Sequence, residues 1–432
     1  MLRNTVWAFG AQFIRLVMTL LLLRLLAPSE RGLQSLLVLL PTVIATLSMF
    51  GVPAAVPVLL HRGFAGRRLL QTVWGVALVL ALLLSLLFIP AMPFLRAYLQ
   101  QSVKGSYLIT QNMVLLGWLL LIPTLLVELL RSWLVAERRM RAYALSQIVV
   151  AVAQLLLALV LVWGQHGGAI GAVWAMIVGT WLGLLYTIVV VGDWRSFRPR
   201  LEAAILRPMF GLGLRAHIGN SVQLLNYRLD SLLIGPLLHT VAVGQYTTAV
   251  TLAELIWNIP NAVAVALLPH VAAGGEQTTP AAARHTLLLA GVSALLLLIG
   301  AWPLLLVVNP AYLPAWPALA LLLPGVITLS LSKVLASDLG GRGLPQYASA
   351  ASVVSLVVTV AGDLTLIPLL GIAGAALVSS VAYTLATLLT LLAYLRISHT
   401  PWRELLPGRA EFILYGQLLR QLPGRVGHLS HI

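Results

Sequence analysis

Long apolar runs separated by short polar segments dominate the pattern along this chain. A membrane-spanning helix needs about 20 apolar residues, and most of the runs reach that length, which exceeds the usual length of a strand. The pattern therefore predicts an all-α polytopic membrane protein with about twelve transmembrane helices. The predicted spans are residues 5–27, 33–60, 69–97, 107–135, 142–164, 168–191, 209–237, 242–271, 283–308, 315–338, 346–368 and 372–396.

Composition and charge agree with this topology. The 432 residues are 60% hydrophobic and 9% charged, with a net charge of +15. Most arginines fall on one side of the predicted spans, whereas the other side has only Arg24, Arg31, Arg96 and Lys104. Because cytoplasmic loops are enriched in Lys and Arg, both termini are predicted to be cytoplasmic. The topology accounts for the excess positive charge, so the charge does not indicate nucleic-acid binding.

A polar segment at residues 192–208 separates two sets of six spans. Gly32 and Pro57 in the first set have counterparts at a common offset, Gly244 and Pro269, in the second. Small residues are common where membrane helices pack, so these matches alone leave a duplication open, and the central linker favours it. We predict two pseudo-symmetric six-helix lobes around a central cavity, residues 1–200 and 201–396, followed by a basic cytoplasmic tail, residues 397–432.

Polar stripes run along three of the predicted spans. Ionisable groups inside membrane helices usually face a bundle interior or an aqueous cavity. On helical geometry, the polar residues of the first, seventh and eighth spans each occupy one side of their helix, so we expect a wet cavity between them. The candidate substrate-binding residues are Arg15, Arg215, Arg228, Lys333, Gln223, Asn226, Asn258 and Asn261, and the candidate coupling residues are Glu254 and Asp230.

The cations among these residues indicate an anionic cargo. A guanidinium fork is suited to bidentate contact with phosphate oxygens, so Arg15 and Arg215 favour a phosphorylated ligand. The alternative is that the cations neutralise buried carboxylates in structural pairs, and for Arg228 and Asp230 this alternative is slightly favoured. The carboxylates in question are Glu254, Asp230, Asp338 and Asp363. Glu128 and Arg131 are three residues apart and are expected to bridge each other.

Glu254 has two interpretations of equal weight. A single deep carboxylate can take up a proton and couple transport to a gradient, or it can stay ionised beside an arginine and couple nothing. Pro260, one turn further along, removes a backbone hydrogen bond and predicts a kink.

Several kinds of chemistry lack support in the sequence. The chain has no Cys, no cluster of His, Asp and Glu with metal-ligand spacing, and no phosphate-binding loop. No arrangement for nucleophilic catalysis can be argued, and every loop is short. We therefore predict no enzyme activity, no cofactor and no metal.

The sequence resembles a known family at several places. The opening "RNTVWAFGAQFIRLVMTLLLLRLLAPSERGLQSLL" and the segment "FGVPAAVPVLLHR" are similar to the start of the polysaccharide-unit (O-antigen) flippases. These flippases belong to the multidrug/oligosaccharidyl-lipid/polysaccharide exporter superfamily. The segments "YRLDSLLIG", "VGQYTTAVTLAELIWNIPNAVAVALLPH" and "GRGLPQYASAASVVSLVVTVAGDLTLIPLLGIAGAALVSS" resemble its seventh, eighth, and eleventh to twelfth helices. The likeness covers about residues 2–396 and is carried by diffuse apolar and small-residue patterns.

The resemblance implies a function in surface polysaccharide biosynthesis. A member of this family is a flippase of the bacterial inner (plasma) membrane that moves a polyprenyl-diphosphate-linked oligosaccharide from the cytoplasmic to the outer leaflet by alternating access. Its expected partners are the lipid-linked oligosaccharide, membrane lipids and other polysaccharide-assembly proteins. A proton- or sodium-coupled multidrug antiporter of the same superfamily is the alternative. A membrane-embedded glycan polymerase would need a large outer loop, and a structural scaffold would not explain charges at mid-depth.

Overall fold

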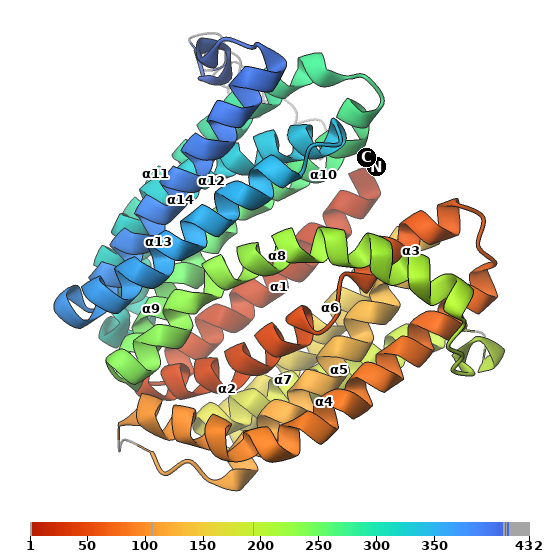
Figure 1. The fold of residues 1–432 in the computed structure, drawn as a ribbon. Helices are drawn as coiled ribbons and strands as arrows, with labels where there is room; N and C mark the ends of the chain where they lie inside the picture. The colour runs from red at the N-terminus through yellow and green to blue at the C-terminus, as the bar shows by residue number, and fades with distance from the viewer. Residues whose placement is uncertain (1, 105–106, 193, 409–410, 412, 414–432) are drawn as a thin grey trace, which may run out of the picture. The chain divides into compact units, whose positions relative to one another are not determined.

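The computed structural model describes residues 2–104, 107–192, 194–408, 411 and 413, and every regular element among them is a helix (Figure 1). All the predicted spans are helical, so the all-α polytopic membrane fold is confirmed. The helices of the first half are α1 (Leu2–Leu25), α2 (Pro28–Leu47), α3 (Val52–His61), α4 (Gly66–Val103), α5 (Gln111–Ala136), α6 (Met140–Ala158) and α7 (Gly168–Val191). Those of the second half are α8 (Ala203–Leu237), α9 (Thr240–Glu254), α10 (Asn258–Ala272), α11 (Thr279–Val308), α12 (Ala315–Gly341), α13 (Gln346–Leu370) and α14 (Ile372–Ser398).

Two of the predicted spans are each divided into two helices. The second span breaks between α2 and α3, where Phe50 and Gly51 have φ angles of +47° and +74°. A Cβ atom at Gly51 would lie 2.0 Å from the Gly213 carbonyl oxygen of α8, so only glycine allows this close approach. The eighth span breaks at a 3₁₀ turn, η3 (Leu255–Trp257), one turn before Pro260. Because proline cannot donate to the carbonyl four residues earlier, α-helical hydrogen bonding is interrupted here, as the predicted kink requires.

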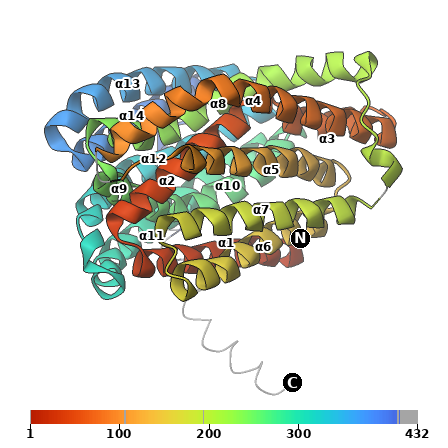
Figure 2. The same cartoon turned by 90° about the horizontal axis from the view of Figure 1, so that it is seen from below.

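The described chain forms two compact units. The first consists of Met1–Thr247, Leu305–Pro314 and Asp363–Ile372, and the second of Thr248–Leu304, Ala315–Gly362 and Ala373–Ile432. In the first unit, α6 packs against both α1 and α7, and α8 packs against α3 and α4 (Figure 2). The lobe boundary at residue 200 stays a prediction, since the packing of α8 by itself does not identify the lobe to which that helix belongs.

The core of the first unit is built from apolar faces that recur at helical spacing. Val73, Leu125 and Leu129 are fully buried where α4 meets α5, and Met209 of α8 joins the same cluster. Because lipid tails are as apolar as these side chains, the cluster stabilises the unit through close van der Waals packing. The surfaces that face away from this core remain apolar, as expected for helices in contact with lipid: Leu87 and Phe94 of α4 are among the exposed side chains.

The C-terminal ends of α1 and α11 cap each other within the first unit. Asn309, directly after α11, donates to the carbonyl oxygens of Leu23 and Leu26, at 3.1 and 3.5 Å. In return, Arg24 donates to those of Val307 and Val308, at 3.3 and 2.9 Å. The last carbonyls of a helix have no partner inside it, and cations are favourable near them. The two helix ends therefore satisfy each other.

The start of the tail is attached to the second unit. Leu405, in the 3₁₀ turn η6 (Trp402–Leu405), is buried against Leu267, Leu335 and Tyr394. Arg284 of α11 donates to the Glu411 carboxylate at 2.6 Å and to the Glu404 carbonyl at 2.8 Å. Glu411 also accepts from the Gly408 amide at 2.8 Å. These contacts form a latch between the tail and α11.

We expect the latch to open at low pH. The Gly408 amide, and after it the Arg284 guanidinium, hold the pKa of Glu411 below its usual range. A group with a depressed pKa stabilises the docked state above its ordinary pKa, and that stabilisation is lost as the pH falls through the lowered value. The protection factors of the η6 amides, which correct for the intrinsic pH dependence of exchange, should therefore fall at acidic pH. Glu411→Gln should give fast exchange already at neutral pH, and an unchanged rate in that variant would contradict the latch.

Candidate functional site

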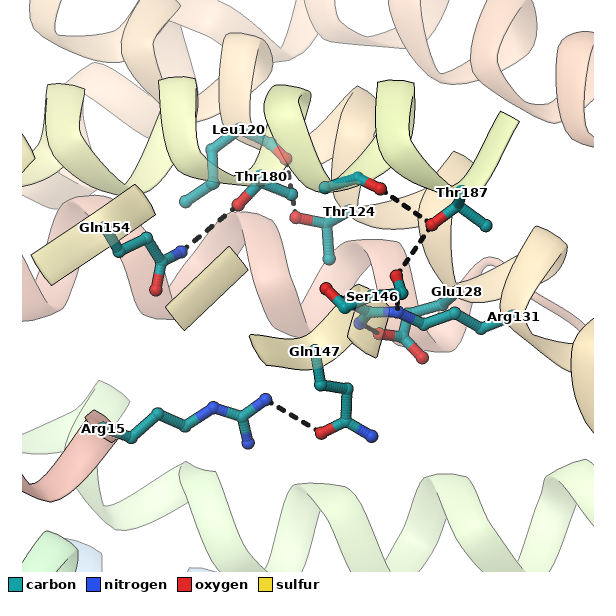
Figure 3. Close-up of polar contacts among 11 residues, drawn as sticks. Arg15, Leu120, Thr124, Glu128, Arg131, Ser146, Gln147, Gln154, Thr180 and Thr187 are labelled. Atoms are coloured by element: carbon teal, nitrogen blue, oxygen red, sulfur yellow. Dashed lines mark hydrogen bonds and ion pairs between the residues drawn. The ribbon is translucent and has the colours of Figure 1, made fainter. Parts of the chain in front are cut away.

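A polar network in the first unit joins three helices around Arg131 of α5 (Figure 3). Arg131 donates to Glu128 at 2.6 Å, and to the hydroxyl and carbonyl oxygens of Ser146 at 3.0 and 3.1 Å. Ser146 in α6 lies 2.7 Å from the Thr187 hydroxyl of α7. The predicted bridge between Glu128 and Arg131 is present. Because Arg131 is buried and each of its three nitrogens donates to a neighbour, its role is to hold α5, α6 and α7 together.

Arg15 of α1 extends from the opposite side toward this network. Its Nη2 donates to the Gln147 side chain of α6 at 3.0 Å (Figure 3), and Glu128 is the nearby carboxylate that interacts with it electrostatically. Among the residues that the structure describes, Arg15 forms no ion pair, and its side chain is only partly buried. A guanidinium held by one neutral amide keeps most of its five donors available to a ligand.

A second polar cluster surrounds the break in the eighth span, within the second unit. The Lys333 ammonium of α12 donates to Asn261 of α10 at 2.8 Å and lies 4.4 Å from the centre of the Trp257 ring. Glu254 interacts electrostatically with Lys333, and Asn258 donates to the Leu255 carbonyl at 3.0 Å. The break thus brings together four of the predicted residues, Glu254, Asn258, Asn261 and Lys333.

Aromatic residues of this cluster were missing from the sequence prediction. The rings of Trp257 and Tyr383 of α14 have centroids 6.1 Å apart at an interplanar angle of 62°, an edge-to-face arrangement. Trp257 follows Glu254 by three residues, so it belongs to the polar stripe on helical geometry. That spacing was the available signal, whereas Tyr383 lies more than a hundred residues away and carried none.

The predicted polar residues of α8 differ in how deeply they are buried. Asn226 and Asp230 are each only 1% exposed, whereas Gln223 and Arg228 are half-buried. Asp230 accepts hydrogen bonds from the Tyr246 hydroxyl of α9 and, at 2.6 Å, from the Ser231 amide. The partner that Asp230 needed therefore includes a tyrosine that the sequence did not single out. Arg215 is a residue of α8, and its side chain lies outside the described part of the structure.

The first and second clusters differ in their chemistry. Arg15 offers a planar fork of donors, which suits a diphosphate. Lys333, Asn258 and Asn261 offer one cation and two amides beside an aromatic ring, a set that suits the hydroxyl groups of a sugar. Within the described residues, no three His, Asp or Glu side chains gather as the ligands of a metal ion would.

Comparison with known proteins places this arrangement in context. A family model described as "Polysaccharide biosynthesis protein" matches residues 21–302, well over half of the chain. No curated protein sequence gives a significant match.

Solved structures share the fold over nearly the whole length. The lipid II flippase MurJ, in an inward closed conformation, aligns with a TM-score of 0.79 at 12% identity, covering 94% of this chain and 89% of that chain. A multidrug resistance MATE family transporter, in an inward-facing conformation, aligns with a TM-score of 0.72 at 14% identity, covering 90% and 95%. At this identity the likeness establishes the fold, which is that of the MOP superfamily, to which the matched MATE transporter belongs.

Proposed function

The chain belongs to the polysaccharide biosynthesis protein family, and from this premise we propose that it is a flippase for a polyprenyl-diphosphate-linked oligosaccharide. In the proposed cycle, the head group crosses from the cytoplasmic to the outer leaflet of the bacterial inner membrane while the polyprenyl chain stays among the lipids. Alternating access between the predicted lobes, residues 1–200 and 201–396, would expose the head group first to one side and then to the other.

The observation that carries the proposal is that Arg15 lies near the middle of α1 with few partners among the described residues. It lies 13 residues from the start of α1 and 10 from its end, so it is about 15–20 Å from either end of the helix. A charge at that depth costs about 2.5–3.5 kcal/mol on the insertion scale. Among the described residues, the Arg15 guanidinium donates to one side-chain amide, that of Gln147, and forms no ion pair. An anionic cargo explains why this cost is tolerated, because diphosphate oxygens fit a guanidinium fork.

The cluster around Lys333 supports the glycan part of the cargo. Its ammonium and the amide groups of Asn258 and Asn261 offer both donors and acceptors, and Trp257 adds an apolar surface. Sugars present hydroxyl groups beside apolar ring faces, so a mixed surface of this kind is suited to them. We propose that Gln223, Asn226 and Arg228 of α8, with Arg215, complete the binding surface.

A cation-coupled multidrug antiporter is the competing function, because the MATE transporter has the same fold. Its cargo would be cationic, and the positive charges of Arg15 and Lys333 would repel it. Either function can use coupling, for which Glu254 and Asp230 remain the proposed residues.

Transport by the purified protein tests the proposal. Reconstituted liposomes should exchange a fluorescent polyprenyl-diphosphate oligosaccharide between leaflets. Arg15→Ala should reduce the initial rate about tenfold or more, since charged hydrogen bonds contribute about 1.5–3 kcal/mol. Arg15→Lys should retain part of the rate because it keeps the charge and loses the fork.

The controls separate binding from folding. Arg62→Ala removes an exposed arginine at the end of α3 and should leave the rate unchanged. Lys333→Ala should slow exchange of the oligosaccharide more than exchange of the polyprenyl diphosphate without sugar. No exchange by the wild-type protein, together with export of a cationic dye under a proton gradient, would reject the flippase and favour the antiporter.

A further inference from the structure

The Gln147 side chain accepts the hydrogen bond of Arg15, and the packing of α6 holds it in place. Ser146, the preceding residue, accepts from Arg131 of α5 at 3.0 Å and lies 2.7 Å from the Thr187 hydroxyl of α7. Consecutive residues of a helix point about 100° apart, so Gln147 turns away from this network. Its Oε1 accepts from Nη2 of Arg15 at 3.0 Å (Figure 3). The network around Arg131 therefore fixes the position from which Gln147 reaches α1.

The charges of this region do not cancel among the described residues. Arg131 and Glu128 form an ion pair at 2.6 Å, so the Glu128 carboxylate already has a hydrogen-bonded cation. The bond between Arg15 and Gln147 adds no charge, because the amide oxygen is neutral. Two guanidinium groups and one carboxylate leave one positive charge in excess. A positive charge that is partly removed from water and lacks a hydrogen-bonded counter-ion favours the binding of an anion.

The amide of Gln147 orients the Arg15 guanidinium without neutralising it. Glutamate has almost the same length and shape as glutamine, and its carboxylate could accept in the same place. A carboxylate, however, binds a guanidinium through two parallel hydrogen bonds and supplies the counter-charge. The charge of Arg15 would then be satisfied within the protein. With glutamine, one nitrogen is held, and most of the five N–H donors of the guanidinium remain for a ligand.

We propose that Gln147 is a positioning residue that makes the Arg15 site selective for anions. It holds the guanidinium toward α6 by one hydrogen bond and leaves the positive charge to the ligand. A diphosphate is the ligand class that this arrangement suits, because a planar fork of donors binds phosphate oxygens in pairs. That this diphosphate is part of a transported lipid rests on the proposed function, whereas the binding of an anion at Arg15 does not.

Binding of inorganic pyrophosphate to the purified protein in detergent tests the proposal without transport. The specific signal in isothermal titration calorimetry is the part that Arg15→Ala removes. Gln147→Glu should weaken this binding about tenfold or more, since the new carboxylate takes a charged hydrogen bond from the ligand. Gln147→Leu loses only the neutral positioning bond and should weaken the binding about fivefold or less. Gln165→Glu adds the same carboxylate at an exposed position and should leave the affinity unchanged.

The order of the two Gln147 variants distinguishes this role from a merely structural one. Gln147→Glu keeps an acceptor for Arg15 and Gln147→Leu loses it, so a structural role predicts the larger loss for leucine. The positioning role predicts the larger loss for glutamate. Gln147→Asp and Gln147→Asn repeat the comparison with a shorter side chain, and the charged member should again bind pyrophosphate more weakly. Thermal unfolding of each variant shows that it is folded.

Two results would overturn the proposal: a smaller loss in Gln147→Glu than in Gln147→Leu, or no pyrophosphate binding that depends on Arg15. The proposed function can fail separately. If pyrophosphate binds as expected but the wild type does not exchange the lipid-linked oligosaccharide, the flippase is rejected and the role of Gln147 stands. If the wild type exchanges the oligosaccharide and Gln147→Glu does so at the same rate, the flippase stands and the role of Gln147 is rejected.

Discussion

Gly32→Ala should destabilise the folded protein by about 3 kcal/mol or more, although alanine is normally the better residue in a helix. A Cβ atom at Gly32 would lie 1.9 Å from the carbonyl oxygen of Thr240 and 3.0 Å from the Gly244 nitrogen. Both are backbone atoms of α9, which cannot move aside as a flexible side chain can. Inserting a methyl group into a packed site typically costs about 1–3 kcal/mol, and a backbone clash lies at or above the upper end of that range.

Thermal unfolding in detergent measures this effect against a matched control. Gly291 of α11 is also a helical glycine, but nothing lies within 4 Å of the position of its Cβ atom. Gly291→Ala should therefore be neutral or stabilise the protein by up to about 1 kcal/mol. The same substitution thus has opposite expected signs at the two positions. Equal Tm values for the two variants would mean that α2 and α9 do not approach each other in this way.

The contact between α2 and α9 is reciprocal. A Cβ atom at Gly244 would lie 2.0 Å from the Pro28 carbonyl oxygen and 3.0 Å from the Gly32 nitrogen. Gly32 and Gly244, like Pro28 and Thr240, are 212 residues apart in the sequence. Gly32 thus contacts Thr240, and its counterpart Gly244 contacts Pro28, the counterpart of Thr240. Such an exchange of contacts is what a twofold axis between the two segments produces. The reciprocal contact therefore supports the duplication predicted from glycine and proline spacing, with the axis passing between these helices.

The sequence predicted the spans well because a membrane imposes one strong rule, a sufficient length of apolar residues. It predicted the Glu128–Arg131 bridge for a similar reason, since the two residues are neighbours on one helix. The breaks in the second and eighth spans were harder. Pro260 marks the break in the eighth span directly. The break in the second span depends on the close approach of Gly51 to Gly213, a contact between distant segments.

The candidate site was less predictable, because its partners come from different helices. The helical phase of Asp230 indicated that it needed a partner, but nothing in the sequence assigned Tyr246 to it. Asp363 was grouped with carboxylates that arginines neutralise, and only packing distinguishes it from Asp338. Periodicity identifies the face on which a side chain lies. The residue that contacts that side chain from another helix depends on how the helices pack, which no local pattern in a single sequence encodes.

A disulfide between α2 and α9 should arrest transport. The hydroxyl oxygens of Ser35 and Thr247 are 3.2 Å apart, and these residues are also 212 positions apart, so they meet on the same pseudo-twofold axis. Side chains this close suit a disulfide, and the chain has no Cys of its own to interfere. In the predicted topology this contact lies at the outer ends of both helices. These ends must separate before the head group can leave on the outer side, if the proposed alternating access holds.

The oxidised Ser35→Cys/Thr247→Cys variant should therefore exchange the lipid-linked oligosaccharide about tenfold more slowly or worse, and a reductant should restore the rate. Each single variant under the same oxidant should exchange normally. Thr328→Cys/Thr384→Cys is the matched pair, because those hydroxyls are also 3.2 Å apart but join α12 and α14, both in the predicted C-terminal lobe. That crosslink should have no effect. If the Ser35–Thr247 crosslink forms and exchange continues at the full rate, α2 and α9 stay in contact throughout the cycle, and the two lobes must rock about this contact as a fixed pivot.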